Sequence, residues 1–131
     1  MLLAIDHGHH AIAFDRHGDH SSPPVVLLHG LSSARSSYDA VVAHLLAHAV
    51  EHRWIQVVNA DLRGHGQSSH VPTDSYDAAG YAADVIALIE HVDAGPALLV
   101  GHSLGGVVAT AVAQQPPDLV SRLLLAAPPL F

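Results

Sequence analysis

The chain has 131 residues, half of them hydrophobic and 13% charged, which is the composition of one folded domain rather than of a disordered segment. Twelve Asp and Glu residues against five Lys and Arg residues give a formal charge of −7, which argues against nucleic acid or an anionic membrane surface as a partner. The absence of cysteine excludes disulfides and thiolate metal sites. The start lacks the basic segment of a signal peptide and no apolar run could span a membrane, so we expect a cytoplasmic protein.

The first predicted elements form a small antiparallel unit. Residues 2–5 and 11–14 have the composition of two short strands, and a turn at His7-Gly8 would join them into a hairpin. Residues 21–24, Ser-Ser-Pro-Pro, predict a loop. The continuous apolar run over 25–28 is typical of a strand that is buried on both faces.

The rest of the chain alternates between helices and strands. Helices are predicted over 38–46, 81–92 and 104–114, and strands over 54–58, 97–100 and 123–125. Gly95-Pro96 and Pro116-Pro117 would stop the second and third of these helices. The apolar stripes of the first two helices are interpreted as core faces. The alternation predicts an α/β fold, a mostly parallel sheet with helices on both faces that follows the antiparallel N-terminal hairpin.

Histidines are frequent near the N-terminus but have no helical ligand spacing. We therefore expect them to be solvated side chains rather than metal ligands. The positions are His7, His9, His10, His17 and His20.

The hexapeptide Gly101-His102-Ser103-Leu104-Gly105-Gly106 follows the predicted strand 97–100 and opens an alanine-rich helix. This setting is that of a nucleophile elbow, in which a serine sits at the tip of a tight, strained strand-to-helix turn. The neighbouring glycines supply the clearance that such a turn needs. The Lys-Ser/Thr pair of a phosphate-binding loop is missing, which disfavours that alternative.

Two other polar segments follow predicted strands, namely His29–Ser32 and Asp61–Ser68. Ligands of open α/β sheets gather at the carboxyl ends of the strands, so these segments should lie beside the elbow. We interpret Arg63 and His65 as structural, and His29 as a residue that shapes its loop.

With its three motifs in this order, the chain resembles the α/β-hydrolase fold superfamily over nearly its whole length, and more narrowly the cofactor-independent hydrolases that carry a helical cap. The resemblance implies that Ser103 is the nucleophile and that the backbone N–H groups of Leu104 and Leu31 form the oxyanion hole. It places Gly30 and His102 on the substrate side. It further implies a small-molecule substrate with an ester or related acyl bond, and neither a cofactor nor a metal.

The chain departs from the family pattern after the serine. The family order is Ser, then Asp or Glu, then His, but no histidine follows His102 and Asp118 is the sole acidic residue there, at the wrong end of its strand. We therefore expect residues 1–131 to be the N-terminal part of a hydrolase domain, ending near where a cap would be inserted. The strand over 123–125 would then expose an apolar sheet edge, a predicted site of self-association.

Two alternatives remain open at this point. The chain could be a non-catalytic or degenerate fragment that needs a partner. It could also belong to the carbon–carbon bond hydrolases or cofactor-free haloperoxidases, which share the fold and the serine elbow.

Overall fold

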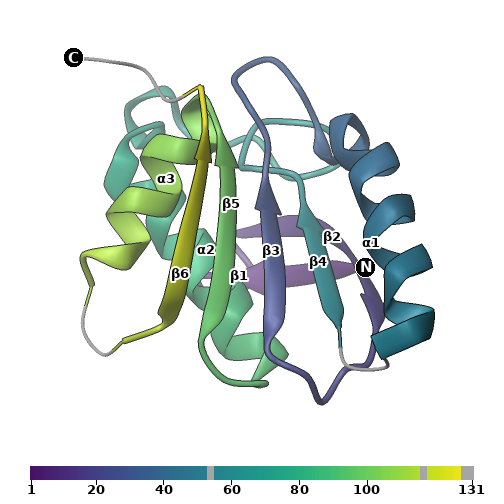
Figure 1. The fold of residues 1–131 in the computed structure, drawn as a ribbon. Helices are drawn as coiled ribbons and strands as arrows, with labels where there is room; N and C mark the ends of the chain where they lie inside the picture. Colours follow the sequence, from purple (N-terminus) through teal and green to yellow (C-terminus); the bar gives the residue numbers. More distant parts are fainter. Residues whose placement is uncertain (53–54, 116–117, 128–131) are drawn as a thin grey trace.

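The centre of the computed structural model, which describes residues 1–52, 55–115 and 118–127, is a six-stranded sheet with the order β1-β2-β4-β3-β5-β6 (Figure 1). Strands β4, β3, β5 and β6 run parallel, while β1 pairs with β2 and β2 with β4 in antiparallel fashion. The predicted fold class is therefore confirmed. The strands are β1 (Leu2–Ile5), β2 (His10–Gly18), β3 (Pro24–Leu28), β4 (Gln56–Ala60), β5 (Ala97–His102) and β6 (Val120–Ala126). The helices are η1 (Arg35–Tyr38), α1 (Asp39–His52), η2 (Thr73–Ser75), α2 (Ala78–Val92) and α3 (Leu104–Ala113).

The predicted elements all exist; β2 and α1 run beyond their predicted ends at residues 14 and 46, to Gly18 and His52, and β4 is shifted along the chain. The prediction placed this strand over 54–58, of which Trp54 lies outside the described residues, whereas the strand runs over Gln56–Ala60 with every side chain buried. Its two polar residues are tolerated because each is bonded to a distant carbonyl. Gln56 Nε2 donates to Ser22 O at 2.6 Å, and Asn59 Nδ2 donates to Arg35 O at 2.8 Å.

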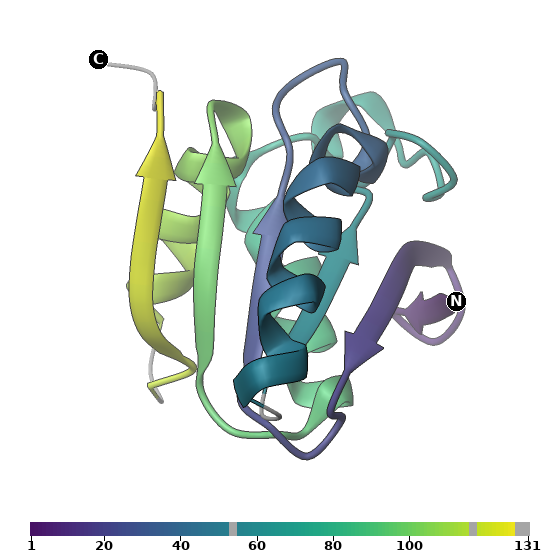
Figure 2. The same ribbon diagram turned by 45° about the vertical axis from the view of Figure 1, so that its right-hand side comes forward.

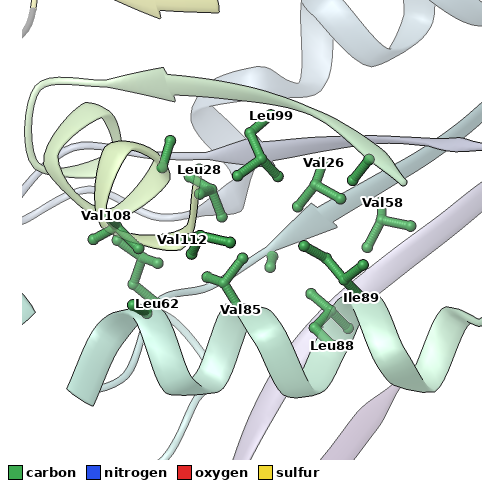
Figure 3. Packing of buried hydrophobic residues seen from close by; sticks show 14 of the residues in the cluster. Val26, Leu28, Val58, Leu62, Val85, Leu88, Ile89, Leu99, Val108 and Val112 are labelled. Atoms are coloured by element: carbon green, nitrogen blue, oxygen red, sulfur yellow. The ribbon is translucent and has the colours of Figure 1, made fainter. Parts of the chain in front are cut away.

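The larger core cluster lies between the sheet and the helices α2 and α3 (Figure 3). All five apolar positions predicted for the stripe of α2 are buried, which confirms it as a core face; they are Tyr81, Val85, Leu88, Ile89 and Val92. The helix ends at Val92, ahead of the predicted stop at Gly95-Pro96, with Asp93 in the left-handed conformation at φ 48°. The other predicted stop, Pro116-Pro117, lies outside the described residues.

The core face predicted for the first helix is confirmed at four of its five positions, which are Tyr38, Val41, Val42, Leu45 and Leu46. Val42 is buried at 7% exposure, and Tyr38, Leu45 and Leu46 are partly buried against the same cluster, whereas Val41 is 42% exposed. Tyr38 belongs to η1 instead, where its hydroxyl donates to Leu28 O at 3.0 Å. Val41 stays exposed because α1 covers its side of the sheet alone, over β3 and β4, with no second helix beside it among the described residues (Figure 2).

Strand β6 lies at one end of the sheet and pairs, within the described residues, with β5 alone. Its three leucines are 39%, 60% and 39% exposed at Leu123, Leu124 and Leu125. The strand thus has the exposed apolar character that the sequence predicts, and self-association through it stays a prediction. None of the described helices has the length and apolarity needed to cross a membrane.

Candidate active site

Ser103 lies between the last residue of β5 and the first residue of α3, in a backbone conformation of φ 53° and ψ −114°. A positive φ at a residue with a side chain is strained, and such strain clusters at functional sites. The turn is held on both sides, because Ser103 N–H donates to Ala126 O at 3.1 Å and Ser103 O accepts from Gly106 N–H at 2.9 Å. The hydroxyl makes no capping bond to α3. The backbone is therefore fixed while the side chain stays free to react.

The elbow closes only because its flanking residues are glycines. A Cβ at Gly101 would overlap the carbonyl of Gly105, and a Cβ at Gly105 would overlap the carbonyl of Leu28 at the end of β3. Both obstacles are backbone atoms, which cannot rotate away as a side chain would. The glycines thus bring the N-terminus of α3 directly against the end of β3.

The residues named from the sequence for the substrate side lie together. A Cβ at Gly30 would lie 3.1 Å from Nδ1 of His102 and 3.5 Å from Cβ of Ser103. His102 is exposed, and Leu31 beside Gly30 is 68% exposed. Within the part of the chain that the structure describes, the N–H groups of Leu31 and Leu104 donate to no acceptor. One of these unused donors lies in the loop after β3, and the other lies at the first residue of α3.

The loop after β3 is a tight turn. Gly30 O accepts from Ser33 N–H at 3.2 Å, and Ser32 has a positive φ of 59°. His29 Nδ1 donates to the same Gly30 O at 2.7 Å, and its Nε2 accepts from Leu62 N–H at 2.9 Å. The interpretation of His29 as a loop-shaping residue agrees with these bonds. Burial lowers the pKa of His29 below its ordinary value, so the ring is neutral near pH 7.

His65 makes a matching pair of bonds from the loop after β4. Its Nδ1 donates to Arg63 O at 2.9 Å, and its Nε2 accepts from Ser32 N–H at 3.2 Å. The rings of His29 and His65 lie 5.0 Å apart. The sequence interpretation of His65 as structural did not include this contact with the loop of Leu31, because the two positions are 33 residues apart.

Asp61 organises the loop after β4 and is another residue that the motif alone did not single out. Its carboxylate is 1% exposed and accepts from the guanidinium of Arg35, from Arg35 N–H at 2.7 Å and from Gln67 N–H at 2.9 Å. Gly66 must be small because a Cβ there would overlap this carboxylate. A buried carboxylate bonded in this way stabilises the loop and has no role as a base.

Arg63 is buried at 7% exposure and binds the carboxylate of Asp84 on α2 through Nε at 2.6 Å and Nη2 at 2.7 Å. These hydrogen bonds raise the pKa of Arg63. His10 Nε2 also lies 2.9 Å from Asp84, so the expectation that His10 is solvated is wrong: its side chain is 9% exposed and closes this buried cluster. Arg63 thus has a structural position, as the sequence indicates.

Among the described residues after Ser103, none is placed to serve as the acidic residue or the histidine of a catalytic triad. Asp118 precedes β6 and lines a cavity with Gly95 and Pro96, at the opposite end of the strands from the elbow. Among the described residues no group of three or more His, Asp or Glu side chains could hold a metal ion.

A strained serine between a central parallel strand and a helix defines the α/β class of proteins with a nucleophile elbow. Comparison with known proteins agrees. A model of the alpha/beta hydrolase fold family matches residues 23–131, and the chain therefore belongs to that family.

Among its relatives is the sn-1-specific diacylglycerol lipase ABHD11 of Danio rerio, which is 37% identical over 112 residues covering 86% of this chain and 33% of that protein. The non-heme chloroperoxidase of Streptomyces lividans is 37% identical over 117 residues covering 87% of this chain and 40% of that protein. The structure of a thioesterase domain from the curacin biosynthetic pathway superposes with a TM-score of 0.84 at 31% identity, over 99% of this chain and 47% of that one. The chain thus spans about a third of the length of the lipase relatives.

Proposed function

We propose that Ser103 is the nucleophile of a serine hydrolase that cleaves an ester or related acyl bond in a small molecule. The observation that carries this proposal is the strained backbone of Ser103, at φ 53° and ψ −114°, beneath a hydroxyl that makes no capping bond. Strain of this kind persists only where the surrounding structure enforces it. Gly101 and Gly105 supply that enforcement, since neither position has room for a side chain.

In the proposed reaction the Oγ of Ser103 forms a bond to the carbonyl carbon of the substrate while its proton passes to a base. The carbonyl oxygen becomes an oxyanion, which the N–H groups of Leu31 and Leu104 stabilise at the N-terminus of α3. The base returns the proton to the leaving oxygen or sulfur, the bond to the carbonyl carbon breaks, and the alcohol or thiol departs from an acyl-serine. Water hydrolyses that ester in a second round through the same donors.

The base and its acidic partner are proposed to come from outside residues 1–131. Residues 104–131 contain no histidine, and Asp118 lies at the wrong end of the strands. His29 does not replace the base, because its Nε2 already accepts a hydrogen bond from Leu62. A serine hydroxyl without a base is a weak nucleophile, so we expect slow acylation of the 131-residue chain.

The test is covalent labelling of the 131-residue chain with a fluorophosphonate, followed by intact mass measurement and peptide mapping. We expect one adduct on Ser103 that forms faster when imidazole is added as an external base. Ser103→Ala should form none, and Ser37→Ala, a change at an exposed serine of η1, should behave like the parent chain. If no adduct depends on Ser103, with or without imidazole, the non-catalytic alternative holds.

A second candidate is cofactor-free haloperoxidase chemistry, favoured by the relative named as a non-heme chloroperoxidase, at 37% identity. The two candidates differ in the substrates they need. Halogenation that requires peroxide, halide and Ser103 would favour the second, whereas ester turnover without peroxide favours the first.

A further inference from the structure

We infer that His29 and His65 form a pair of positioning residues that fix the two peptide groups on either side of Leu31 and so aim its N–H at the substrate carbonyl. The inference rests on the proposed function, since Leu31 has an oxyanion role only in a reaction at Ser103. It goes further, because it assigns a task to two histidines that neither attack nor accept a proton from the substrate.

The peptide group that carries Leu31 N–H is held through its oxygen atom. In a trans peptide the carbonyl and the N–H point in opposite directions, so whatever fixes Gly30 O also fixes the direction of Leu31 N–H. Gly30 O accepts from His29 Nδ1 at 2.7 Å and from Ser33 N–H at 3.2 Å. His29 is itself fully buried and is anchored to the neighbouring loop through Leu62 N–H. The direction of the Leu31 N–H is therefore fixed, through His29, by the loop that follows β4.

The following peptide group is held through its nitrogen atom. Ser32 N–H donates to His65 Nε2 at 3.2 Å. Ser32 also has a positive φ of 59°, which residues other than glycine adopt at a cost. The bond to His65 compensates for that cost and keeps the turn from relaxing toward an ordinary conformation.

The bonds require one protonation state in both rings. A carbonyl can only accept and a backbone N–H can only donate, so each ring must carry its proton on Nδ1 and keep Nε2 as an acceptor. A second proton on either ring would place an N–H against another N–H. The two rings are 5.0 Å apart, and burial first and His65 second lower the pKa of His29. The negative charge of Asp61 acts in the opposite direction on the pKa of His29. That carboxylate is paired with the guanidinium of Arg35.

Two substitutions at His65 separate its bonds. In His65→Gln the Oε1 atom can take the place of Nε2 and accept from Ser32 N–H. In His65→Asn the shorter side chain can still donate to Arg63 O but cannot reach Ser32. His9→Asn, a change at an exposed histidine of the hairpin, is the matched control.

The test combines nuclear magnetic resonance with labelling of Ser103 in the 131-residue chain. We expect both rings to show the Nδ1–H tautomer, and the Ser32 amide to be at least about tenfold better protected from hydrogen exchange in the parent chain than in His65→Asn at pH 7.5. His65→Gln should keep the protection, His65→Asn should lack it, and His9→Asn should follow the parent chain. The rate of adduct formation at Ser103 should fall at least about tenfold in His65→Asn, since one lost oxyanion donor costs about 10²–10³ in rate.

The outcomes distinguish the two proposals. Equal Ser32 protection in the parent chain and both His65 variants overturns the positioning role, whatever Ser103 does. An unchanged adduct rate in His65→Asn, with protection lost, also overturns it. Protection that follows His65 as expected, in a chain whose Ser103 never forms an adduct, overturns the proposed function instead.

Discussion

Replacing Ser103 by glycine should stabilise the protein relative to replacing it by alanine. Alanine keeps the Cβ that makes φ 53° and ψ −114° unfavourable, whereas glycine tolerates positive φ without that steric conflict. Both variants lack the hydroxyl, so their difference reports the backbone strain and not the loss of a side-chain contact.

The expected magnitude follows from two opposing effects. A strained residue of this kind costs about 1–3 kcal/mol in the folded state. Relative to alanine, glycine lowers the free energy of unfolding by about 0.4–1 kcal/mol because the unfolded chain has more conformational freedom. The glycine variant should therefore be more stable than the alanine variant by about 1 kcal/mol. At Ser37, which lies in η1 and has no positive φ, the order should reverse, with glycine about 1 kcal/mol less stable than alanine.

The assay is urea unfolding of the four variants, monitored by circular dichroism. Their free energies of unfolding are obtained with one shared m-value. The quantity of interest is the sign of the glycine-minus-alanine difference at each site. If alanine is the more stable residue at position 103 by the margin seen at position 37, the elbow stores no backbone strain, and the main observation behind the proposed nucleophile loses its physical basis.

Three further predictions concern the core, the buried ion pair and pH. Leu88→Ala should cost about 2–5 kcal/mol in urea unfolding because Leu88 is fully buried, whereas Leu124→Ala, at a side chain 60% exposed, should cost under about 0.5 kcal/mol; similar losses would contradict the core assignment. Asp84→Asn should cost about 3–5 kcal/mol because it leaves the Arg63 guanidinium buried without its counter-charge, and a loss below about 1 kcal/mol would refute that pairing. Because burial lowers the pKa of His29, the unfolded chain binds its proton first as the pH falls. The contribution of His29 to stability should be constant above about pH 6.5 and decrease below it by up to about 1.4 kcal/mol per pH unit. A pH profile unchanged by His29→Gln would exclude this contribution.

The elbow could be predicted from the sequence because its geometry depends on neighbouring residues. The spacing of Gly101 and Gly105 about Ser103 leaves few alternatives, and the structure has the turn at that position. The stripe of α2 was predicted for a similar reason, since the sheet and α3 cover it fully.

The features that could not be predicted depend on distant partners. The bounds of β4 were shifted because Gln56 and Asn59 are polar, and only their bonds to Ser22 and Arg35 make them acceptable inside a sheet. The exposure of Val41 depends on how much of the sheet α1 covers, which no local pattern encodes. His10 could not be assigned to a buried cluster, because its partner Asp84 is 74 residues away.

The strand order also has a consequence for how fast the protein folds. The central strand β3 pairs along one side with β4 and along the other with β5, so that Val25 meets both Val57 and Leu98. Parallel pairing between such distant segments requires large loops to close before any stabilising contact forms, and topologies of this kind fold slowly. During that delay β3 and β5 present unpaired apolar edges to other chains. We therefore expect the refolding yield to fall as protein concentration rises, since association would compete with the late closure of the sheet around β3.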